Sequence, residues 1–554
     1  MSGRVICADA WAMAYTVPMP VRQHDHVSTI APVTGADERV RVTYRLFGDQ
    51  NEAAALARKI AFEQSVELPE AQVPDEIRQQ VVGRVEEISP EAGIESARRA
   101  TISYDARHAG AHLSQLLNLI FGNVSIYPRV RLLDLELPQG YLDGFKGPRF
   151  GIDGLRTLTG VHGRPLLATA LKPRGAPVES LAAIARDFAL GGGDIVKDDQ
   201  NLADDFETFK RRVEACARAV DEANARSGRR CLYFPHIAAP AAELNRYLDY
   251  VTALGLHGVL ICPMILGLET TRDIAARHSL VLMAHPALTG SFTQSSDQGI
   301  DHGLLLGTLF RTAGADISIF PNFGGRFSYS REECLAISRR LREPLGALSS
   351  AWPSPGGGMA IDKLDVMGDD YGADAIFLVG GALFAHNREL REGTRAFMEA
   401  IRARFQERLT PPSDPASTQV EDAVEIQRYF PFQEGFQWKG RESSPYKDAG
   451  DLAFKGVRRV ELVGKFGERT SCDLRYFEVQ PGGHTSREKH LHTHIIIGAR
   501  GEAVLALGNR RLPFSQHDIA YIAPLEVHQL INETDEPFGF YCVVDHNRDR
   551  PMKP

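Results

Sequence analysis

Eight short apolar runs recur between Arg164 and Arg404, and this repetition constrains the fold more than any other feature of the chain. The runs are PLLATALKP, DIVKD, CLYFPHI, GVLICPM, LVLMAHP, DISIFPN, ALSSAWPSP and AIFLVGG. An amphipathic segment of roughly ten to twenty residues follows each run, which indicates repeated βα units and a parallel sheet. Eight units in roughly 240 residues predict a closed (β/α)8 TIM barrel. An open doubly wound sheet is the alternative, which the even count and the length disfavour.

The rest of the chain predicts further domains, because 554 residues exceed what one core supports. We expect an irregular N-terminal arm over residues 1–37, an α+β domain over 38–148 and the barrel over 149–408. The α+β domain should hold strands near 39–46, 84–88 and 100–104, with helices near 51–65 and 112–121. LTPPSDPASTQVED predicts a linker at 409–422. Short strand-like runs after it predict an all-β domain over 423–554.

Composition excludes several kinds of partner. The chain has 63 basic and 71 acidic side chains and a net charge of −8, which gives no electrostatic footprint for nucleic acid. No apolar run is long enough to span a bilayer, so we expect no membrane partner. Seven scattered cysteines without a CxxC pair favour reduced thiols and a cytoplasmic location.

Polar residues stand at the ends of five of the eight runs, where the chemistry of such barrels is placed. They are Lys172, the group Lys197, Asp198 and Asp199, then His236, His285 and Asn322. We expect all of them to face one mouth. Mg²⁺ prefers oxygen ligands, and a lysine carbamylated by CO2 becomes an oxygen ligand. A strand-end ion pair is the alternative interpretation of the lysine and its two aspartates.

Glycines follow the last three runs. Gly356, Gly357 and Gly358 follow the seventh run, and Gly380 and Gly381 follow the eighth. Loops at these positions hold phosphate groups on backbone N–H donors, so a phosphorylated small-molecule substrate is expected. The loop after the sixth run carries Arg326 within NFGGRFSYS and is expected to close over a ligand.

A cluster of metal-ligand residues marks the all-β domain. Glu488, His490, His492 and His494 alternate, so they share one face of an extended strand. His528, from a later strand, is expected to join them. Imidazole and carboxylate bind divalent Mn, Fe, Ni or Zn, and the sequence does not distinguish among them. A surface run of histidines is the alternative.

Much of the chain resembles the RuBisCO large-chain superfamily. The resemblance rests on VTYRL, FEQSVELP, FGNVSIYPRVRLLDLELP, LATALKPRG, GGGDIVKDDQN, GGGM and VGG, in order. It implies an α+β domain beside a barrel and a homodimer with shared active sites, to which the partner chain contributes Glu63 and Asn123. It further implies Lys172, Lys197 and His285 as catalytic groups. His236, Arg326, Gly357, Gly358, Gly380 and Gly381 are implied as substrate or phosphate ligands.

Several departures set the chain apart from the carboxylases of that superfamily. Gln200 stands where carboxylases have a metal-binding glutamate, His285 precedes Pro286 instead of arginine, and NFGGRF lacks a lysine. The resemblance is therefore to the RuBisCO-like proteins, which act through enolates and do not fix CO2. It implies that Lys197, Asp199 and Gln200 bind Mg²⁺. This set carries one negative charge fewer than the KDDE sequence of the carboxylases, because Gln200 replaces the glutamate. If Lys197 remains an amine, it is a candidate general base.

The all-β domain resembles the cupins. Glycine and ligand spacing matches Gly482, Glu488, His490 and His494, and the second motif matches His528 and Asn532. This implies a metal site made by Glu488, His490, His494 and His528, with His492 as an alternative ligand. GGHTSREKHLHTH and FGFYCVVDHNRDRP resemble the small cupin that removes methanethiol from a methylthioxylulose phosphate.

These resemblances leave three readings of function. The first is decarboxylation or C–C cleavage of a phosphorylated oxo sugar acid or ketose through an enolate, with a metal cupin acting on a related product. The second is a methylthioribulose-phosphate isomerase fused to a methylsulfurylase-like cupin. In the third, the barrel is catalytic and the cupin only binds a ligand.

Overall fold

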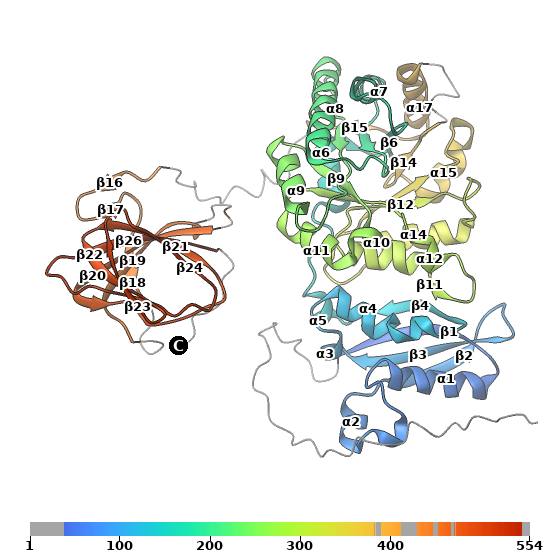
Figure 1. Cartoon of the computed structure of the whole chain (residues 1–554). Helices are drawn as coiled ribbons and strands as arrows, with labels where there is room; N and C mark the ends of the chain where they lie inside the picture. The colour runs from blue at the N-terminus through green and yellow to red at the C-terminus, as the bar shows by residue number, and fades with distance from the viewer. Residues whose placement is uncertain are drawn as a thin grey trace, which may run out of the picture. The chain divides into compact units, whose positions relative to one another are not determined.

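The computed structural model describes residues 38–381, 383, 389–411, 429–446, 453–466, 470 and 472–545. The predicted N-terminal arm and most of the predicted linker lie outside these residues. The chain divides into two compact units, Met1–Ser417 and Thr418–Pro554 (Figure 1). The first unit holds the α+β domain and the barrel, and the second holds the all-β domain, so the predicted fold class is confirmed.

The α+β domain is one sheet with helices against it. Its strands run in the order β11-β4-β1-β3-β2, and α1 packs on β1, β2 and β3. Strand β1 alternates buried and exposed residues, which gives the sheet its apolar face. The elements are β1 (Arg39–Phe47), α1 (Gln50–Glu63), α2 (Asp75–Gln80), β2 (Arg84–Pro90), β3 (Ala97–Asp105), α3 (Ala106–Ala109), α4 (Leu113–Phe121), β4 (Val130–Glu136) and α5 (Gln139–Leu142).

The barrel uses all eight predicted runs as parallel strands. The order β8-β7-β6-β14-β13-β12-β10-β9 returns on itself, because His236 at the end of β8 forms a parallel bridge with Leu260 of β9. The strands are β6 (Leu166–Leu171), β7 (Ile195–Asp198), β8 (Leu232–Phe234), β9 (Gly258–Ile261), β10 (Val281–Ala284), β12 (Ile317–Pro321), β13 (Trp352–Gly356) and β14 (Ile376–Leu378).

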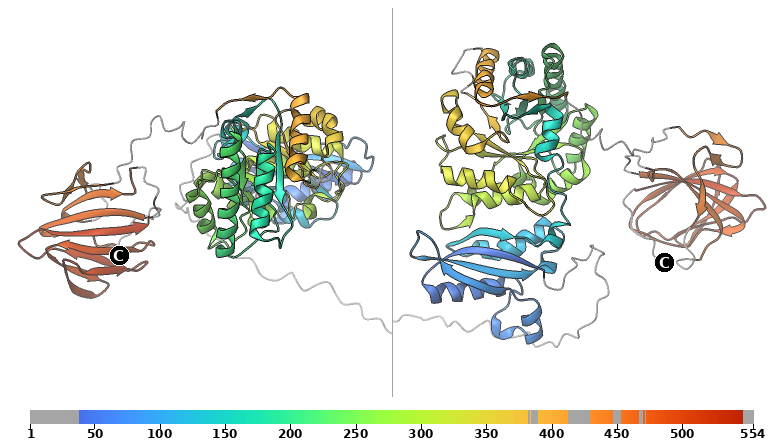
Figure 2. Two further views of the ribbon diagram at one scale, coloured as in Figure 1. Left: turned by 90° about the horizontal axis from the view of Figure 1, so that it is seen from above. Right: turned by 180° about the vertical axis from the view of Figure 1, so that it is seen from behind.

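Helices cover the outside of the barrel (Figure 2). They are α6 (Gly151–Thr159), α7 (Val178–Leu190), α8 (Phe206–Ser227), α9 (Leu244–Ala253), α10 (Pro263–Leu266), α11 (Leu268–Arg277), α12 (Gly290–Thr293), the π-helical η3 (Gly303–Leu309), α13 (Phe310–Thr312), α14 (Arg331–Arg342), α15 (Leu364–Tyr371) and α17 (Leu390–Arg404). Between α12 and η3, the short strand β11 (Gly299–Ile300) pairs with β4 and ties the barrel to the α+β sheet.

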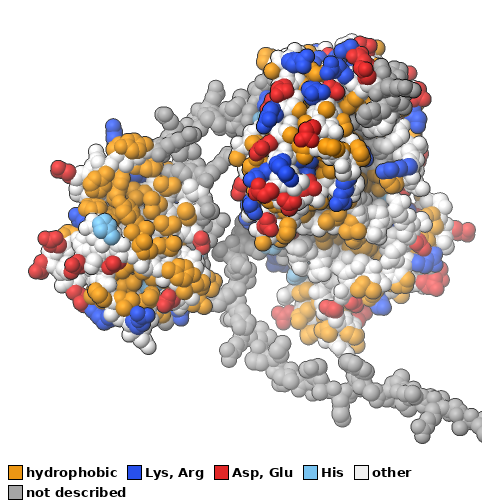
Figure 3. Space-filling model, turned by 45° about the horizontal axis from the view of Figure 1, so that its top comes forward, with side chains coloured by type: hydrophobic (Ala, Val, Ile, Leu, Met, Phe, Trp, Pro, Cys, Tyr) orange, Lys and Arg blue, Asp and Glu red, His pale blue; other side chains and the backbone are white. Residues whose placement is uncertain are grey.

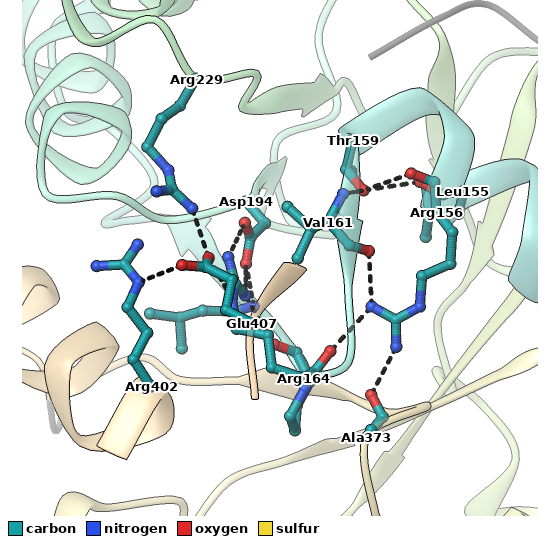
Figure 4. A network of polar contacts seen from close by, with 12 residues as sticks. Leu155, Arg156, Thr159, Val161, Arg164, Asp194, Arg229, Ala373, Arg402 and Glu407 are labelled. Carbon is teal, nitrogen blue, oxygen red and sulfur yellow. Dashed lines mark hydrogen bonds and ion pairs between the residues drawn. The ribbon is translucent and has the colours of Figure 1, made fainter. Parts of the chain in front are cut away.

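The floor of the barrel, at the start of its strands, is closed by a buried ion network (Figure 4). Arg164 donates to Asp194 Oδ2 at 2.7 Å and to Glu407 Oε1 at 2.8 Å. Arg229 and Arg402 also donate to Glu407, each at 2.8 Å. Glu407 directly precedes β15 (Arg408–Leu409), which pairs with β5 (Val161–His162). The network therefore anchors the last described segment of the barrel unit.

The all-β unit is a curled antiparallel sheet around its own core. Its main path runs β23-β22-β25-β20-β26-β21-β24, with β18 and β19 attached to β20. The strands are β16 (Phe432–Gln433), β17 (Gln437–Trp438), β18 (Ser443–Pro445), β19 (Lys455–Val463), β20 (Cys472–His484), β21 (His494–Arg500), β22 (Glu502–Leu507), β23 (Arg510–Ser515), β24 (Ile519–Ile522), β25 (His528–Ile531) and β26 (Phe538–Asp545). Hydrophobic side chains also gather on one outer face of this unit (Figure 3). Ile495, Ile519 and Tyr521 are among its exposed apolar residues.

Candidate active site and candidate metal site

A cavity of about 1160 Å³ opens at the carboxyl ends of the barrel strands. Four basic side chains line it, and among the described residues no acidic side chain does. An anionic substrate suits such a cavity. The lining includes ten residues that the sequence predicts: Lys172, Lys197, Gln200, His285, Arg326, Gly356, Gly357, Gly358, Gly380 and Gly381.

Lys197 is a buried amine inside the barrel. Strand β7 turns Ile195 and Lys197 inward, and the Lys197 side chain is only 2% exposed. Its Nζ donates to the carbonyl of Asp198 at 3.0 Å. Burial, together with the charge of Lys172, lowers the pKa of Lys197 to about 8. A substantial fraction of this amine is therefore neutral near pH 7 to 8 and able to accept a proton.

Lys172 and Asp199 form an ion pair at the edge of the same cavity. Lys172 Nζ lies 3.0 Å from Asp199 Oδ2, and the lysine side chain is 55% exposed. Asp199 Oδ1 accepts hydrogen bonds from the backbone N–H and the side-chain amide of Asn201. Burial raises the pKa of Asp199, but Lys172 and Asn201 outweigh it, so the pKa lies below its usual value. Lys172 thus keeps a charge partner while its ammonium faces the cavity.

The contacts of Asp199 and Lys197 bear directly on the predicted Mg²⁺ site. Both carboxylate oxygens of Asp199 are engaged, by Lys172 and by Asn201. Lys197 as an amine offers no oxygen, which leaves only the amide of Gln200. Mg²⁺ requires several oxygen ligands in octahedral geometry. The residues present therefore do not fit Mg²⁺ while Lys197 is an amine.

His285 presents a neutral N–H. The backbone N–H of Ala287 donates to His285 Nδ1 at 3.1 Å, so the ring proton of the neutral form resides on Nε2. Burial, and then the charge of Lys197, lowers the pKa of His285 to about 3. The imidazole is therefore neutral at physiological pH and can donate to an oxygen on which negative charge develops.

Glycines allow the loops after β12 and β13 to meet. Gly357 and Gly358 have φ of +85° and +68°. A Cβ on Gly358 would lie 2.9 Å from the Cα of Gly325, which real side chains do not tolerate. Gly380 and Gly381 have open space where a Cβ would stand. The mouth thus keeps exposed backbone beside the cationic side chains, as phosphate binding requires.

Three histidines of the all-β unit converge in a second cavity, of about 200 Å³. Ligand atoms of His490, His494 and His528 all lie within 4.8 Å of one another. His490 Nδ1 lies 2.7 Å from the carbonyl of His492, and His528 Nδ1 lies 2.9 Å from that of Glu526. These contacts hold each Nδ1 as the donor and leave Nε2 as the ligand atom.

His494 completes this arrangement. Its Nδ1 contacts Cys542 Sγ at 3.3 Å, and its buried Nε2 has no hydrogen-bond partner. Burial, followed by the neighbouring His528, lowers the pKa of His494 to about 2. Burial, followed by His492, lowers the pKa of His490 to about 4. A neutral imidazole with an unpartnered Nε2 is the kind of ligand that a divalent transition metal takes, so His494 and the two imidazoles beside it fit such an ion.

Glu488 and His492 stand beside this cluster. Glu488 lines the cavity and accepts from Ser486 Oγ at 2.5 Å, but it is not a member of the three-histidine group. The ring of His492 stacks on His490 at 3.7 Å, and its centroid is 6.2 Å from that of His494. His492 therefore supports His490. Glu488 as a fourth ligand stays a prediction.

Comparison with known proteins adds to this geometry. Residues 151–322 match the family model of the ribulose bisphosphate carboxylase large chain, catalytic domain, and residues 475–544 match the cupin domain model. The "ribulose bisphosphate carboxylase-like protein 1" of Rhodopseudomonas palustris is 42% identical over 67% of this chain and 99% of its own. The chain belongs to the RuBisCO large-chain family.

A further relative and a solved structure show which branch of the family the chain resembles. The "5-methylthioribulose-1-phosphate isomerase" of Rhodospirillum rubrum is 38% identical over 66% of this chain and 96% of its own. A crystal structure of a Rubisco-like protein from Rhodopseudomonas palustris is 38% identical, with a TM-score of 0.60, and covers 66% of this chain and 98% of its own. The chain is thus a RuBisCO-like enzyme with a C-terminal cupin domain, not a carboxylase.

Four predicted mouth residues of this RuBisCO-like barrel do not line the cavity. Asp199 lies at its edge, paired with Lys172, and the other three lie elsewhere. Asp198 points outward to the helices and accepts from Arg212 and from the hydroxyl of Tyr233. His236 lies beside Cys262 Sγ, and Asn322 accepts from the hydroxyl of Tyr371. The prediction of one shared mouth is wrong for these three residues. Neighbouring side chains on a strand point to opposite faces, so a position at a strand end does not fix which face is used.

Three further residues of the RuBisCO-like unit bear on its candidate site. Asn123 donates to Glu63 Oε1 at 3.0 Å within the α+β domain, and neither residue lines the barrel cavity of its own chain. Their contribution to a partner's site stays a prediction. Lys363, which the sequence did not predict, lines the cavity at the end of η4 (Ile361–Lys363). No motif distinguishes it from other exposed helical lysines.

Proposed function

We propose that the barrel catalyses proton transfer at a carbon next to a carbonyl group in a phosphorylated sugar, through an enolate. One observation carries the proposal: a buried amine, a neutral imidazole N–H and an ammonium group line one cationic cavity. A base removes the proton, and preorganised donors stabilise the charge that develops on oxygen. The related isomerase supports this class of reaction.

Each residue has a distinct part in this proposal. Lys197 is the general base, because burial makes its neutral form available at neutral pH. Lys172 and His285 Nε2–H stabilise the enolate oxygen. Arg326, Lys363 and the glycine-rich loops hold the phosphate group. After the enolate forms, the Lys197 ammonium returns the proton to the former carbonyl carbon. The hydroxyl proton of the adjacent carbon passes to the enolate oxygen, so the carbonyl group moves by one carbon and the isomerisation is complete.

The substrate class follows from the relative named for 5-methylthioribulose 1-phosphate. That relative supports isomerisation over decarboxylation or C–C cleavage, which the sequence motifs favoured. The test incubates the protein in D2O with methylthio-sugar, ketose and oxo-acid phosphates and follows the products by NMR. We expect deuterium at a carbon next to the carbonyl and no CO2. CO2 release would restore the decarboxylation reading, and no exchange with any compound would contradict an enolate.

For the cupin domain, we propose a divalent transition metal held by His490, His494 and His528. The bound metal would act as a Lewis acid on a ligand oxygen. The observation that carries the proposal is the buried, unpartnered Nε2 of His494 beside the two other imidazoles. We propose that this domain acts on a product related to that of the barrel.

Removing metal with a chelator distinguishes the barrel site from the cupin site. It also distinguishes a catalytic cupin from one that only binds a ligand. EDTA followed by gel filtration should abolish cupin turnover and leave deuterium exchange by the barrel unchanged. If barrel exchange also falls and Mg²⁺ with bicarbonate restores it, Lys197 is carbamylated and the amine proposal is wrong. If no barrel product is transformed by the metal-loaded protein, the cupin only binds its ligand.

We also propose that two copies share the barrel site. Glu63 and Asn123 form a polar pair on the α+β domain that the cavity of the same chain does not use. Mixing Glu63→Ala and Lys172→Ala chains tests this, because a mixed dimer contains one site without either substitution. Restoration of up to about a quarter of the wild-type activity is expected for random pairing. Two inactive variants that stay inactive together would contradict sharing.

A further inference from the structure

The cupin cavity contains an arginine that the metal cluster does not explain. Arg475 lies on β20 on the same face as Phe477 and Val479, both of which belong to the interior core. It lines the same cavity of about 200 Å³ as His490 and His494. A positive side chain therefore points into the interior of the β-barrel beside the candidate metal ligands.

No carboxylate of the described residues neutralises Arg475. Its Nη2 donates to Cys542 Sγ at 3.2 Å, its guanidinium lies over the Phe477 ring, and its buried Nε has no hydrogen-bond partner. Glu461 faces Arg475 across the strand pair, but it is ion-paired with Arg459 at 3.0 Å and Lys465 at 3.4 Å. A guanidinium without a charge partner in a partly buried site is costly, unless a ligand supplies the negative charge.

Arg459 differs from Arg475, although both line the cavity. Its Nε is paired with Glu461, and its Nη1 donates to the carbonyl of Tyr446. The charge of Arg459 is thus compensated within the chain. Of the two arginines, Arg475 is the one whose charge is left for a bound molecule.

We propose that Arg475 binds the anionic group of a small molecule in the cupin cavity, a carboxylate or a phosphate, whose other polar end reaches the metal. This inference rests on the metal site proposed above. A water occupies about 30 Å³ of liquid, so a cavity of about 200 Å³ has room for roughly seven water-sized groups, which suits a small ligand. The guanidinium fork matches two oxygens of either anion.

The experiment uses the full-length protein loaded with Co²⁺, whose visible spectrum reports on its ligands. Inorganic phosphate, acetate and neutral imidazole are titrated separately. We expect phosphate or acetate, or both, to change the spectrum with saturation. Arg475→Met should weaken the binding of the responding anion at least 10-fold, because a charge-assisted bond is lost. Imidazole binding and the Co²⁺ stoichiometry should not change, because they require the histidines alone.

Two control variants test whether the loss of anion binding is specific to the Arg475 guanidinium. Arg475→Lys keeps the charge and should stay within a few-fold of the wild type. Arg510→Met removes the same charge from an exposed position on β23 and should change nothing. Equal anion affinities in Arg475→Met and wild type would overturn the inference, as would an absence of any response to both anions.

Failure of the metal proposal has a different outcome. In that case no spectrum depends on His490, and His490→Ala resembles the wild type. Anion binding is then measured by calorimetry, with the barrel contribution common to all variants. A loss of heat in Arg475→Met, but not in Arg510→Met, would still support the anion site, and equal heats would overturn it.

Discussion

Charged and polar groups are partnered differently at the Lys172–Asp199 pair and floor of the barrel than in the cupin cavity. In the barrel, Lys172 is paired with Asp199, and Glu407 is held by Arg164, Arg229 and Arg402. In the cupin cavity, the Nε2 of His494 and the Nε of Arg475 are buried without hydrogen-bond partners. Buried polar groups are normally satisfied, so unsatisfied ones indicate a missing ligand. The comparison predicts that the Lys172–Asp199 pair needs no metal while Lys197 is an amine, and that the three histidines of the cupin do bind one.

The two cavities also differ in size and in electrostatic character. The barrel cavity measures about 1160 Å³ and is lined by basic side chains, which suits a sugar phosphate. The cupin cavity measures about 200 Å³ and is built around three imidazoles, of which burial lowers the pKa of His490 and of His494. The barrel thus has lysines to stabilise negative charge, whereas the cupin has ligands for an ion that would do so.

The largest effect is expected from Lys172→Ala. Loss of the ammonium beside the reacting oxygen should lower barrel turnover roughly 10³-fold, the scale found when one charge-stabilising group is removed. Cupin metal content should not change. Deuterium exchange and metal analysis on one sample measure both. Lys146→Ala, at an exposed position, is the control. Equal losses of deuterium exchange in Lys172→Ala and Lys146→Ala would contradict the role assigned to Lys172.

The next effect concerns stability. Burial raises the pKa of Glu407, but hydrogen bonds from Arg164 and Arg229 outweigh it and lower the pKa to about 2, against an ordinary 4.5. The stabilisation is therefore complete above about pH 4.5 and is lost as pH falls toward 2. Glu407→Gln should destabilise the barrel unit by about 3 kcal/mol at neutral pH. The difference from the wild type should shrink below pH 4.5.

Thermal unfolding at several pH values measures this effect. The cupin transition should not move, because the network belongs to the barrel unit alone. Glu399→Gln, an exposed position on α17, is the matched control. A pH-independent difference between Glu407→Gln and the wild type would show that the carboxylate charge is not what stabilises the floor.

In the cupin, His490→Ala should weaken metal binding by about 100-fold or more, since even loss of a residue that supports a ligand costs 10- to 100-fold. Barrel exchange should stay unchanged. His517→Asn, at an exposed position with φ of +75° that asparagine tolerates, is the control. Metal content after dialysis gives the answer. An unchanged metal affinity in His490→Ala would contradict the proposal that the cupin, unlike the barrel, is built around a metal.

The sequence predicted the strands better than it predicted side-chain directions. Every barrel run became a strand, because a parallel sheet buried on both faces requires continuous apolar segments. The sequence did not show that Asp198 points to the helices while Lys197 points inward, since that depends on register. Strand β11 was missed because two residues carry no periodic pattern, and helix α6 was missed because glycines at its start hide a short amphipathic pattern.

The predicted sites follow the same division. Histidines at alternate positions predicted the cupin cluster, because period two places them on one face. Lys363 was not predictable, since the path of the loop after β13 brings it to the cavity and no local pattern does. The unpartnered Nε of Arg475 was not predictable either. It arises because Glu461 pairs with Arg459 and Lys465, and not with Arg475.

The smallest effect is expected from Gly358→Ala in the barrel. The Cβ would stand 2.9 Å from Gly325 Cα at a φ of +68°, so the loops after β12 and β13 must separate. If these loops hold the phosphate, KM should rise about 10-fold with little change in kcat, as loss of uniform binding predicts. Gly372→Ala has a similar φ of +71° and open space, and it lies away from the cavity. A KM rise in Gly358→Ala alone would locate phosphate binding in the barrel loops. Equal rises of KM in both variants would instead reflect backbone strain. The contrast between a phosphate-binding barrel and a metal-binding cupin would then lose its support.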